Sequence, residues 1–156
     1  MRTIHTTPSE RQYPVGDIVI RMLTSAEADV LSCRADGVFD DAIDPAWCAE
    51  FFADPRHHLA VAIDGMRVIG MASGVHYLHP DKPPELFVNE VGVAESYRNH
   101  GIGRALLQML LRHATTLGCE SAWVLTEPSN ASARRMYAAA GGVEQKEPPI
   151  MIEFRN

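Results

Sequence analysis

A glycine-rich turn near the middle of the chain has the residue types and the spacing to bind phosphate. It reads Arg98-x-x-Gly101-x-Gly103, with a short β-type run before it and a helical pattern after it. N–H groups at a helix start have no intrahelical partner, and the helix dipole adds partial positive charge there. Both glycines let the backbone approach phosphate oxygens and permit positive φ. We therefore predict a pyrophosphate site formed by Arg98, Asn99, His100, Gly101, Ile102, Gly103 and Arg104.

Two better-known phosphate motifs do not fit this turn. A P-loop requires Gly-x-x-x-x-Gly-Lys-Ser/Thr, which does not occur in the chain. A dinucleotide fingerprint requires a third glycine after Gly101-Ile102-Gly103, where Leu106 stands instead.

The turn resembles the acyl-coenzyme-A loop of the GNAT superfamily of N-acetyltransferases, Gln/Arg-x-x-Gly-x-Gly/Ala after the fourth strand. The resemblance runs from about Ile18 to the end of the chain. It implies an α/β fold with a mixed, mostly antiparallel sheet, a splayed central parallel strand pair and about four helices. It also implies acetyl-CoA as donor, without a metal. In the family, backbone N–H groups of the fourth strand stabilise the oxyanion, and here these belong to Val91, Gly92 and Val93.

A second stretch, Asn130-x-x-Ala133-x-x-x-Tyr137, resembles the distal motif of the family. There the asparagine contacts the cofactor arm and the tyrosine lies near its sulfur, so Tyr137 is the candidate general acid, with Asn130 and Ala133 binding the cofactor. The alternative is that Tyr137 only packs and Asn130 is only an N-cap. The helix ends in Gly141-Gly142 where the family often has Gly-Phe.

Glu90 is the candidate general base, because it interrupts a mostly apolar strand. A carboxylate there is costly unless it is hydrogen-bonded or functional, and partial burial would raise its pKa. The alternative is an edge-facing or salt-bridged glutamate. Glu85 on the same strand is a second candidate, and either could act through water.

An acidic stretch, with Asp36, Asp40, Asp41 and Asp44, separates the first two predicted helices. It could be a solvated loop, but in GNAT enzymes this region lines the acceptor pocket. This stretch, the strand that contains Glu90 and the acidic end of the chain around Glu153 resemble the gentamicin-type aminoglycoside 3-N-acetyltransferases. We therefore predict that Asp40, Asp41, Glu85 and Glu153 bind the acceptor.

The composition of the chain limits the classes of partner that it is expected to bind. The 156 residues suit one domain, and a net charge of −6 argues against nucleic acid and favours a cationic partner. No apolar run approaches the roughly 20 residues of a membrane span. Residues 1–16 are interpreted as a loose leader before a domain of residues 17–156, in a cytoplasmic protein. The cysteines predict reduced, mostly buried thiols, and the histidine spacing argues against a metal site.

The predicted order of elements is that of the family. A strand at Ile18–Arg21 precedes a helix started by a capping box, Thr24-x-x-Glu27, and a second helix follows Asp44-Pro45. A hairpin around Asp64-Gly65, a strand at Leu86–Val93, the helix after Gly103, a strand at Ser121–Thr126 and a helix at Ala131–Ala140 come next. Ile150, Ile152 and Phe154 predict a closing strand.

These observations predict an N-acetyltransferase that uses direct attack of a primary amine on acetyl-CoA. The expected acceptor is a small cationic molecule such as an aminoglycoside, and the prediction allows a homodimer. Acetylation of a protein N-terminus or lysine is the alternative reaction, and an acyl-CoA-binding module without turnover is the alternative class. The sequence does not identify the acceptor, since acceptor specificity lies in variable loops.

Overall fold

The computed structural model describes residues 17–147 and 149–155, and the predicted leader lies outside them. The residues form two compact units that divide after Leu125, and each unit is described by itself. The first unit contains the sheet and the helices that pack on it. The second contains helix α3 and the residues that follow it.

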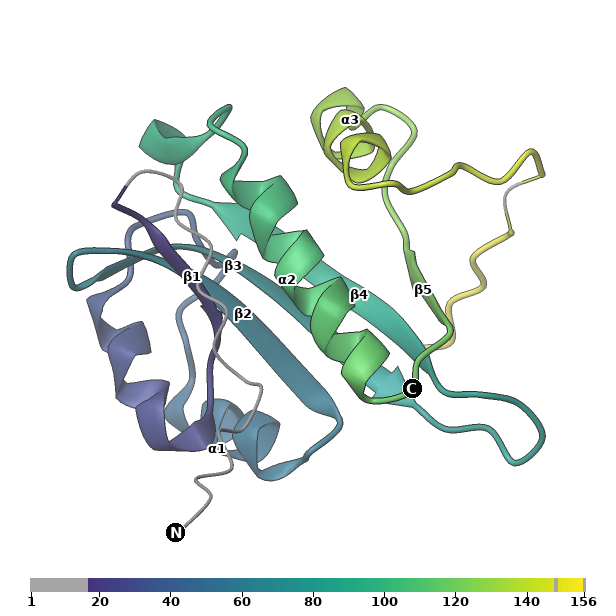
Figure 1. Ribbon diagram of the computed structural model, residues 1–156, viewed down its shortest axis with the longest axis horizontal. Coiled ribbons are helices and arrows are strands. Elements are labelled where there is room, and N and C mark those ends of the chain that lie inside the picture. Colours follow the sequence, from purple (N-terminus) through teal and green to yellow (C-terminus); the bar gives the residue numbers. More distant parts are fainter. Residues whose placement is uncertain (1–16, 148, 156) are drawn as a thin grey trace, which may run out of the picture. The chain divides into compact units, whose positions relative to one another are not determined.

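A five-stranded sheet in the order β1-β2-β3-β4-β5 forms the centre of the first unit (Figure 1). Strands β1 to β4 are antiparallel neighbours, and β5 runs parallel to β4. This is the predicted α/β class with a mixed, mostly antiparallel sheet. The strands are β1 (Val19–Met22), β2 (His57–Asp64), β3 (Arg67–Tyr77), β4 (Glu85–Val93) and β5 (Ser121–Val124). The helices are the 3₁₀ helices η1 (Ser25–Cys33) and η2 (Glu95–Tyr97), and α1 (Pro45–Ala53), α2 (Ile102–Thr116) and α3 (Ala131–Ala139).

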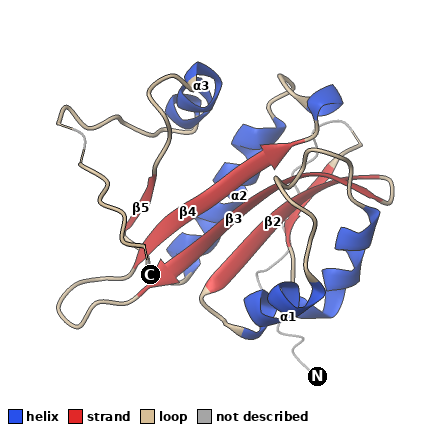
Figure 2. Ribbon diagram, turned by 180° about the vertical axis from the view of Figure 1, so that it is seen from behind, coloured by secondary structure: helices blue, strands red, loops and turns tan. Residues whose placement is uncertain are grey.

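Helix α2 covers one face of the sheet, and glycines on β3 let it approach closely (Figure 1). A Cβ on Gly70 would lie 3.0 Å from Leu106 Cδ1, and one on Gly74 would lie 3.3 Å from Leu110 Cδ2. Because side chains alternate along a strand, the odd-numbered residues from Met71 onward point to the other face. Figure 2 shows that other face, with α1 in front of the strands and α2 behind them.

Strand β5 pairs with β4 along its whole length, but β4 extends well beyond it. Their ladder joins Glu85–Val88 to Ser121–Val124, whereas β4 continues to Val93 beside β3. Within the described residues, the parallel ladder therefore ends at Val88. This is the divergence of the parallel strands that the family resemblance implies.

A β-bulge in β4 changes which side chains share a face. Ser73 pairs with Glu90 and Gly74 pairs with Val88, so Asn89 is the extra residue on β4. In an unbroken strand Glu85 and Glu90 would point to opposite faces. With the bulge, both lie on the face opposite α2.

The two predicted helix starts before β2 have different outcomes. The start of α1 is confirmed, since Asp44 Oδ1 accepts hydrogen bonds from the N–H groups of Ala46 and Trp47 at 2.8 and 3.0 Å. The capping box at Thr24 is wrong. Glu27 forms an ion pair with Arg21 at 2.7 Å and accepts from the Thr24 hydroxyl, so its carboxylate is occupied by side chains. The segment forms the 3₁₀ helix η1 instead of an α-helix.

The predicted closing strand is also wrong. Residues 149–155 have no strand pairing, and the apolar side chains at Ile150, Ile152 and Phe154 are exposed. Alternation gives a segment one apolar face, but a strand also requires a paired edge. In the part of the chain that is described, no helix is long and apolar enough to cross a membrane.

Candidate active site

The glycine turn leads from the end of β4 directly into α2, as predicted. Asn99 has a φ of 63° and Gly101 a φ of 78°, so the backbone turns sharply through the left-handed region. Gly101 is the N-cap residue of α2, and no side chain caps the helix there. The N–H groups at Ile102 and Gly103 therefore begin a helix whose positive dipole end is open to an anion.

Side chains from both sides hold this turn in place. Arg98 Nε donates a hydrogen bond to the Val93 carbonyl at 3.0 Å, and Tyr97 Oη donates to Asp64 Oδ2 at 2.7 Å. The first bond joins the turn to the end of β4, and the second joins it to the β2–β3 hairpin. Arg98 thus has a structural contact besides the phosphate contact that we predict for it.

Glu90 lies on β4 just beyond the point where β5 diverges. Its side chain is half-buried, and burial raises the pKa of its carboxyl group above the usual range. The negative charges of Asp40 and Asp41 raise that pKa further. The structure therefore brings the candidate base together with two of the predicted acceptor-binding residues.

Gly92 is the position at which the acidic loop crosses β4. A Cβ at Gly92 would overlap the Val38 carbonyl oxygen and would lie 3.7 Å from Met71 Cε. Val38 itself is buried, at 1% exposure. The Ala35 N–H donates to the Val68 carbonyl at 2.8 Å, which fixes the start of the loop to β3. The absence of a side chain at Gly92 thus lets the loop that carries Asp40 and Asp41 reach Glu90.

Glu85 has a different environment from Glu90. Tyr77 Oη donates to Glu85 Oε2 at 2.6 Å, and this hydrogen bond lowers the pKa of Glu85. A carboxylate with a lowered pKa is a weak base. The pKa directions therefore favour Glu90 over Glu85 as the proton acceptor.

The second unit contains the distal motif. Asn130 Oδ1 accepts from the Ala133 N–H at 3.1 Å, so Asn130 is the N-cap of α3. Burial raises the pKa of Tyr137, which keeps the phenol protonated at neutral pH. Glu153 is exposed and forms an ion pair with Arg155 at 3.2 Å. The predicted cofactor and acceptor contacts of these residues stay predictions.

The departure from the family at Gly141-Gly142 has a local explanation. Gly141 has a φ of 100°, and its N–H donates to the Ala138 carbonyl, while the Gly142 N–H donates to the Tyr137 carbonyl at 2.9 Å. This is the Schellman ending of a helix. A Cβ on Gly142 would lie 3.0 Å from the Tyr137 carbonyl oxygen, so a larger residue would disturb this ending.

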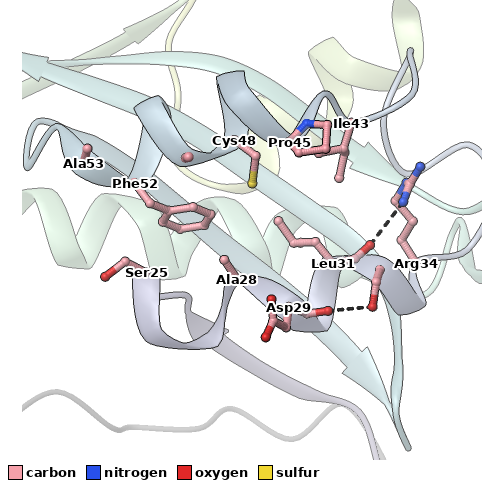
Figure 3. Close-up of a pocket in the computed structure, with 12 residues that line it drawn as sticks. Ser25, Ala28, Asp29, Leu31, Arg34, Ile43, Pro45, Cys48, Phe52 and Ala53 are labelled. Carbon is pink, nitrogen blue, oxygen red and sulfur yellow. Dashed lines mark hydrogen bonds between the residues drawn. The ribbon is translucent and has the colours of Figure 1, made fainter.

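A cavity of about 660 Å³ lies between η1 and α1 (Figure 3). Its lining is mostly apolar and includes Leu31, Cys48 and Phe52. None of the predicted catalytic or binding residues lines it, so the cavity is separate from the candidate site. All three cysteines are free as predicted, but the expected burial is wrong, because Cys33 is exposed and Cys48 and Cys119 are only half-buried.

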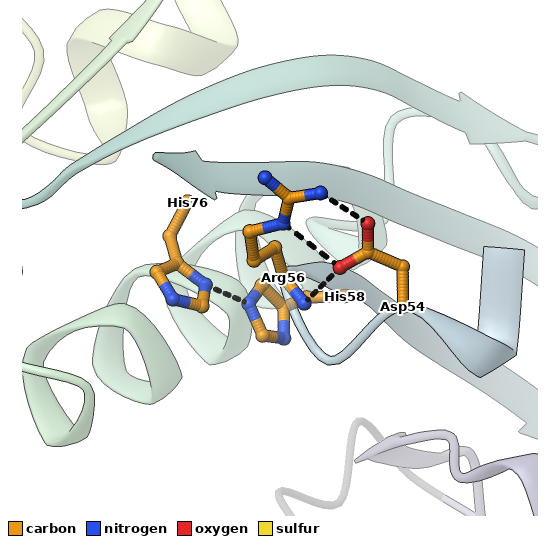
Figure 4. A network of polar contacts seen from close by, with 4 residues as sticks. All are labelled: Asp54, Arg56, His58 and His76. Carbon is orange, nitrogen blue, oxygen red and sulfur yellow. Dashed lines mark hydrogen bonds and ion pairs between the residues drawn. The ribbon is translucent and has the colours of Figure 1, made fainter. Parts of the chain in front are cut away.

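Three histidines, of which His58 is buried and His76 and His113 are half-buried, form a hydrogen-bonded chain that the sequence did not predict. His58 Nε2 lies 2.8 Å from His76 Nδ1, and His58 Nδ1 lies 3.1 Å from His113 Nε2. Figure 4 shows His58 and His76 beside the Asp54–Arg56 ion pair. Burial lowers the pKa of His58 to about 4, with smaller contributions from neighbouring histidines. Among the described residues, no group of histidine, cysteine or acidic side chains is arranged to hold a metal ion.

The fold and this site define a class of protein. Residues 23–141 match the model of the acetyltransferase (GNAT) family. The chain belongs to the GNAT acetyltransferase family.

Two characterised relatives match part of the chain. One is L-2,4-diaminobutyric acid acetyltransferase from Nocardia farcinica, 33% identical over 60% of this chain and 45% of the relative. The other is N-alpha-acetyltransferase RimI from Mycobacterium tuberculosis, 34% identical over 62% of each chain. The matches thus span about half to three-fifths of these relatives.

Solved structures show the same fold at low identity. An aminoglycoside acetyltransferase from an uncultured soil metagenomic sample, in complex with sisomicin, has a TM-score of 0.75 at 14% identity, over 89% of this chain and 97% of that chain. Aminoglycoside acetyltransferase AAC(6')-Iy with a bisubstrate analogue has a TM-score of 0.72 at 21% identity, over 89% and 99%. The latter is a 6'-type enzyme, so the structural likeness is not specific for the 3-N type that the sequence suggested.

Proposed function

We propose that this chain is an acetyl-CoA-dependent N-acetyltransferase that acts by direct attack of a primary amine. The observation that carries this proposal is the junction of β4 and α2. There, the strand that presents Glu90 diverges from β5 and ends at an uncapped helix start. The helix start suits the pyrophosphate of acetyl-CoA. Beyond Val88 no β5 residue pairs with β4, so backbone groups at Val91–Val93 are not used by this ladder and could bind the acyl end of the donor.

In the proposed reaction, each proton transfer and each charge is assigned to a particular residue. Glu90 accepts a proton from the acceptor ammonium, directly or through water, and passes it to solvent. The amine nitrogen forms a bond to the thioester carbonyl carbon, while N–H groups of Val91–Val93 stabilise negative charge on the carbonyl oxygen. The carbon–sulfur bond then breaks. Tyr137 donates its phenolic proton to the leaving thiolate, and the second proton that the nitrogen loses as the amide forms returns through water to the Tyr137 phenolate.

We propose an aminoglycoside as the acceptor. Asp40, Asp41 and Glu90 together favour a molecule with several positive charges. A structural neighbour binds sisomicin, which supports this acceptor class. The proposal covers acetylation at either of two amines of the aminoglycoside, the 3-N amine that the sequence suggested and the 6' amine that AAC(6')-Iy is named for.

A second acceptor class is favoured by the sequence relatives. One is a diaminobutyric acid acetyltransferase and the other an N-alpha-acetyltransferase, which favours a diamino acid or the α-amine of a peptide as the acceptor. Both acceptors also present a primary amine, so the same catalytic residues would serve. Their smaller or extended shapes distinguish them from an aminoglycoside.

A thiol-release assay with acetyl-CoA tests the proposal. The acceptor panel contains kanamycin, sisomicin, L-2,4-diaminobutyrate and a short peptide with a free N-terminus. We expect turnover with an aminoglycoside, its loss in Glu90→Gln, a smaller loss in Tyr137→Phe, and its retention in Asp36→Asn, which alters an exposed carboxylate at the start of the same loop. Faster turnover of diaminobutyrate or of the peptide than of either aminoglycoside would contradict the aminoglycoside as acceptor and support the second acceptor class. Tight acetyl-CoA binding without thiol release from any acceptor would indicate the non-catalytic module.

A further inference from the structure

A row of half-buried side chains extends from Glu90 along the face of the sheet opposite α2. The register pairs Ser73 with Glu90, Val75 with Phe87 and Tyr77 with Glu85. Residues that pair directly across two strands point to the same side. The row therefore lies on the face opposite α2, and none of it depends on the second unit.

Trp123 on β5 continues this row. It pairs with Phe87 across the parallel ladder, and the centroids of the two rings lie 4.4 Å apart. Trp123 is 42% exposed, and Phe87 is half-buried. A large aromatic surface is thus left open to solvent beside the candidate active site.

A chain of hydrogen bonds fixes the polar atoms of this surface. Trp123 Nε1 donates to Tyr77 Oη at 2.6 Å, and Tyr77 Oη donates to Glu85 Oε2 at 2.6 Å. The indole and phenol rings are therefore held by their polar atoms, and the exposed part of the Trp123 ring is left for contact with a ligand. The same chain holds the Glu85 carboxylate in one orientation.

The Glu85 carboxylate is negatively charged at neutral pH. The pKa of Glu85 is lowered first by the Tyr77 hydrogen bond, and further by the positive charge of Lys82 and a hydrogen bond from the Ser121 side chain. Lys82 is exposed, and a second cation arriving at Glu85 would compete with its long, mobile side chain. A fixed carboxylate next to aromatic rings suits an ammonium group attached to a ring with an apolar face.

The distance between Glu90 and Glu85 determines how long an acceptor must be to contact both carboxylates at once. Ser73 and Tyr77, the partners of Glu90 and Glu85, are four residues apart on β3, which corresponds to about 13 Å. A diamino acid is too short to reach from one carboxylate to the other. A three-ring aminoglycoside has the required length, with rings that would lie over Phe87 and Trp123.

We propose that Glu85, Tyr77, Phe87 and Trp123 form a second acceptor subsite, which binds the far aminated ring of an extended acceptor whose reacting amine lies at Glu90. This inference rests on the proposed function. In it Glu85 serves recognition rather than proton transfer, and Tyr77 and Trp123 act as positioning residues for it. The subsite favours three-ring over two-ring aminoglycosides.

Fluorescence provides a test that needs no turnover. The chain has two tryptophans, so Trp47→Phe leaves Trp123 as the single indole reporter. Trp47 is 73% exposed on α1, away from the row. We expect kanamycin to change the Trp123 emission in a saturable manner, and neamine, a two-ring acceptor, to change it much less. Glu85→Gln in the same background should weaken the kanamycin response.

Kinetics provide the second part of the test. In Trp123→Ala, kcat/KM for kanamycin should fall by about tenfold, the scale of one ring-stacking contact, while kcat/KM for neamine stays near the wild-type value. Trp123→Phe should restore part of the loss, and Trp47→Ala is the matched control. Equal losses for both acceptors, or no loss for either, would overturn the subsite.

The two parts separate this inference from the proposed function. A saturable Trp123 response without thiol release would support the subsite and contradict the transferase activity on aminoglycosides. Thiol release with kanamycin but no Trp123 response would support the activity and contradict the subsite. Absence of both would contradict both.

Discussion

Gly92→Ala should damage the acceptor site while leaving the fold in place. The added methyl group would overlap the carbonyl oxygen of Val38, and backbone atoms cannot move aside as a flexible side chain can. Restoring an ordinary contact requires a shift of about 1 Å between the acidic loop and β4. Because Asp40 and Asp41 move with this loop, the acceptor is displaced by a similar amount relative to Glu90.

The expected loss is large for such a small change. A misplacement of about 1 Å in a catalytic arrangement can cost about 10²-fold, so we expect acceptor kcat/KM to fall by that order. Acetyl-CoA affinity should change little, because the helix start at α2 does not move. Overpacking of this kind costs about 1–3 kcal/mol of stability, and urea unfolding measures that part separately.

Gly65→Ala is the matched control for this variant. It adds the same methyl group at a φ of +60°, where nothing lies within 4 Å of the new atom. It therefore carries the conformational cost of replacing a glycine without touching the acidic loop, and its kcat/KM should stay near the wild-type value. The reasoning is refuted if folded Gly92→Ala turns over the acceptor as well as Gly65→Ala does.

Four further outcomes are expected. Gly101→Asp places a carboxylate at the predicted pyrophosphate site, so calorimetry should show a marked loss of acetyl-CoA affinity; unchanged affinity would exclude the site. Asp40→Asn combined with Asp41→Asn should raise the acceptor KM several-fold, an effect that shrinks with added salt because exposed charges are screened; a KM unaltered at low salt would assign both residues to a solvated loop. Glu90→Gln should lower kcat by about 10²-fold and remove the acidic limb of the pH–rate profile, and an intact limb would point to another base. Burial lowers the pKa of His58 to about 4 from 6.5. As pH falls below 6.5, His58 of the unfolded chain binds a proton before His58 of the folded chain does, so the free energy of unfolding decreases. The decrease reaches up to about 3 kcal/mol as the pH approaches 4. Urea titrations at several pH values should show a smaller decrease in the free energy of unfolding for His58→Leu than for the wild type. The same dependence on pH in both proteins would contradict this.

Features that depend on neighbouring residues in the chain were predictable from the sequence. The uncapped helix start at Gly101, the Asp44-Pro45 helix start and the Asp64-Gly65 hairpin each follow from a few adjacent residues, and each is present in the structure. The raised pKa of Glu90 was also expected, because a carboxylate in an apolar strand loses hydration. Local stereochemistry and burial suffice for these features.

Features that depend on distant residues were not predictable in the same way. The segment after Thr24 forms a 3₁₀ helix, and its Glu27 is paired with Arg21 on the preceding strand, a contact that the local Thr24-x-x-Glu27 pattern does not show. Nothing in the local pattern shows that Val38 crosses over Gly92. The Trp123–Tyr77–Glu85 hydrogen bonds also require the register of β3, β4 and β5 together.

The extra residue Asn89 has a consequence for the inheritance of this site. Loss of its single codon would restore a regular ladder between β3 and β4, and the fold would tolerate it because Asn89 is exposed. The same loss would leave every other residue of β4 paired as before, because Glu90 would still pair with Ser73 and Val88 would still pair with Gly74. Glu85 and Glu90 would then be four positions apart on a regular strand, so both carboxylates would stay on one face. A relative without the extra residue would lose only the local bend and added twist that a bulge gives β4 beside Glu90. A gap of one position here in a family alignment therefore marks a change in how β4 bends at the site, with the same side chains on the same face.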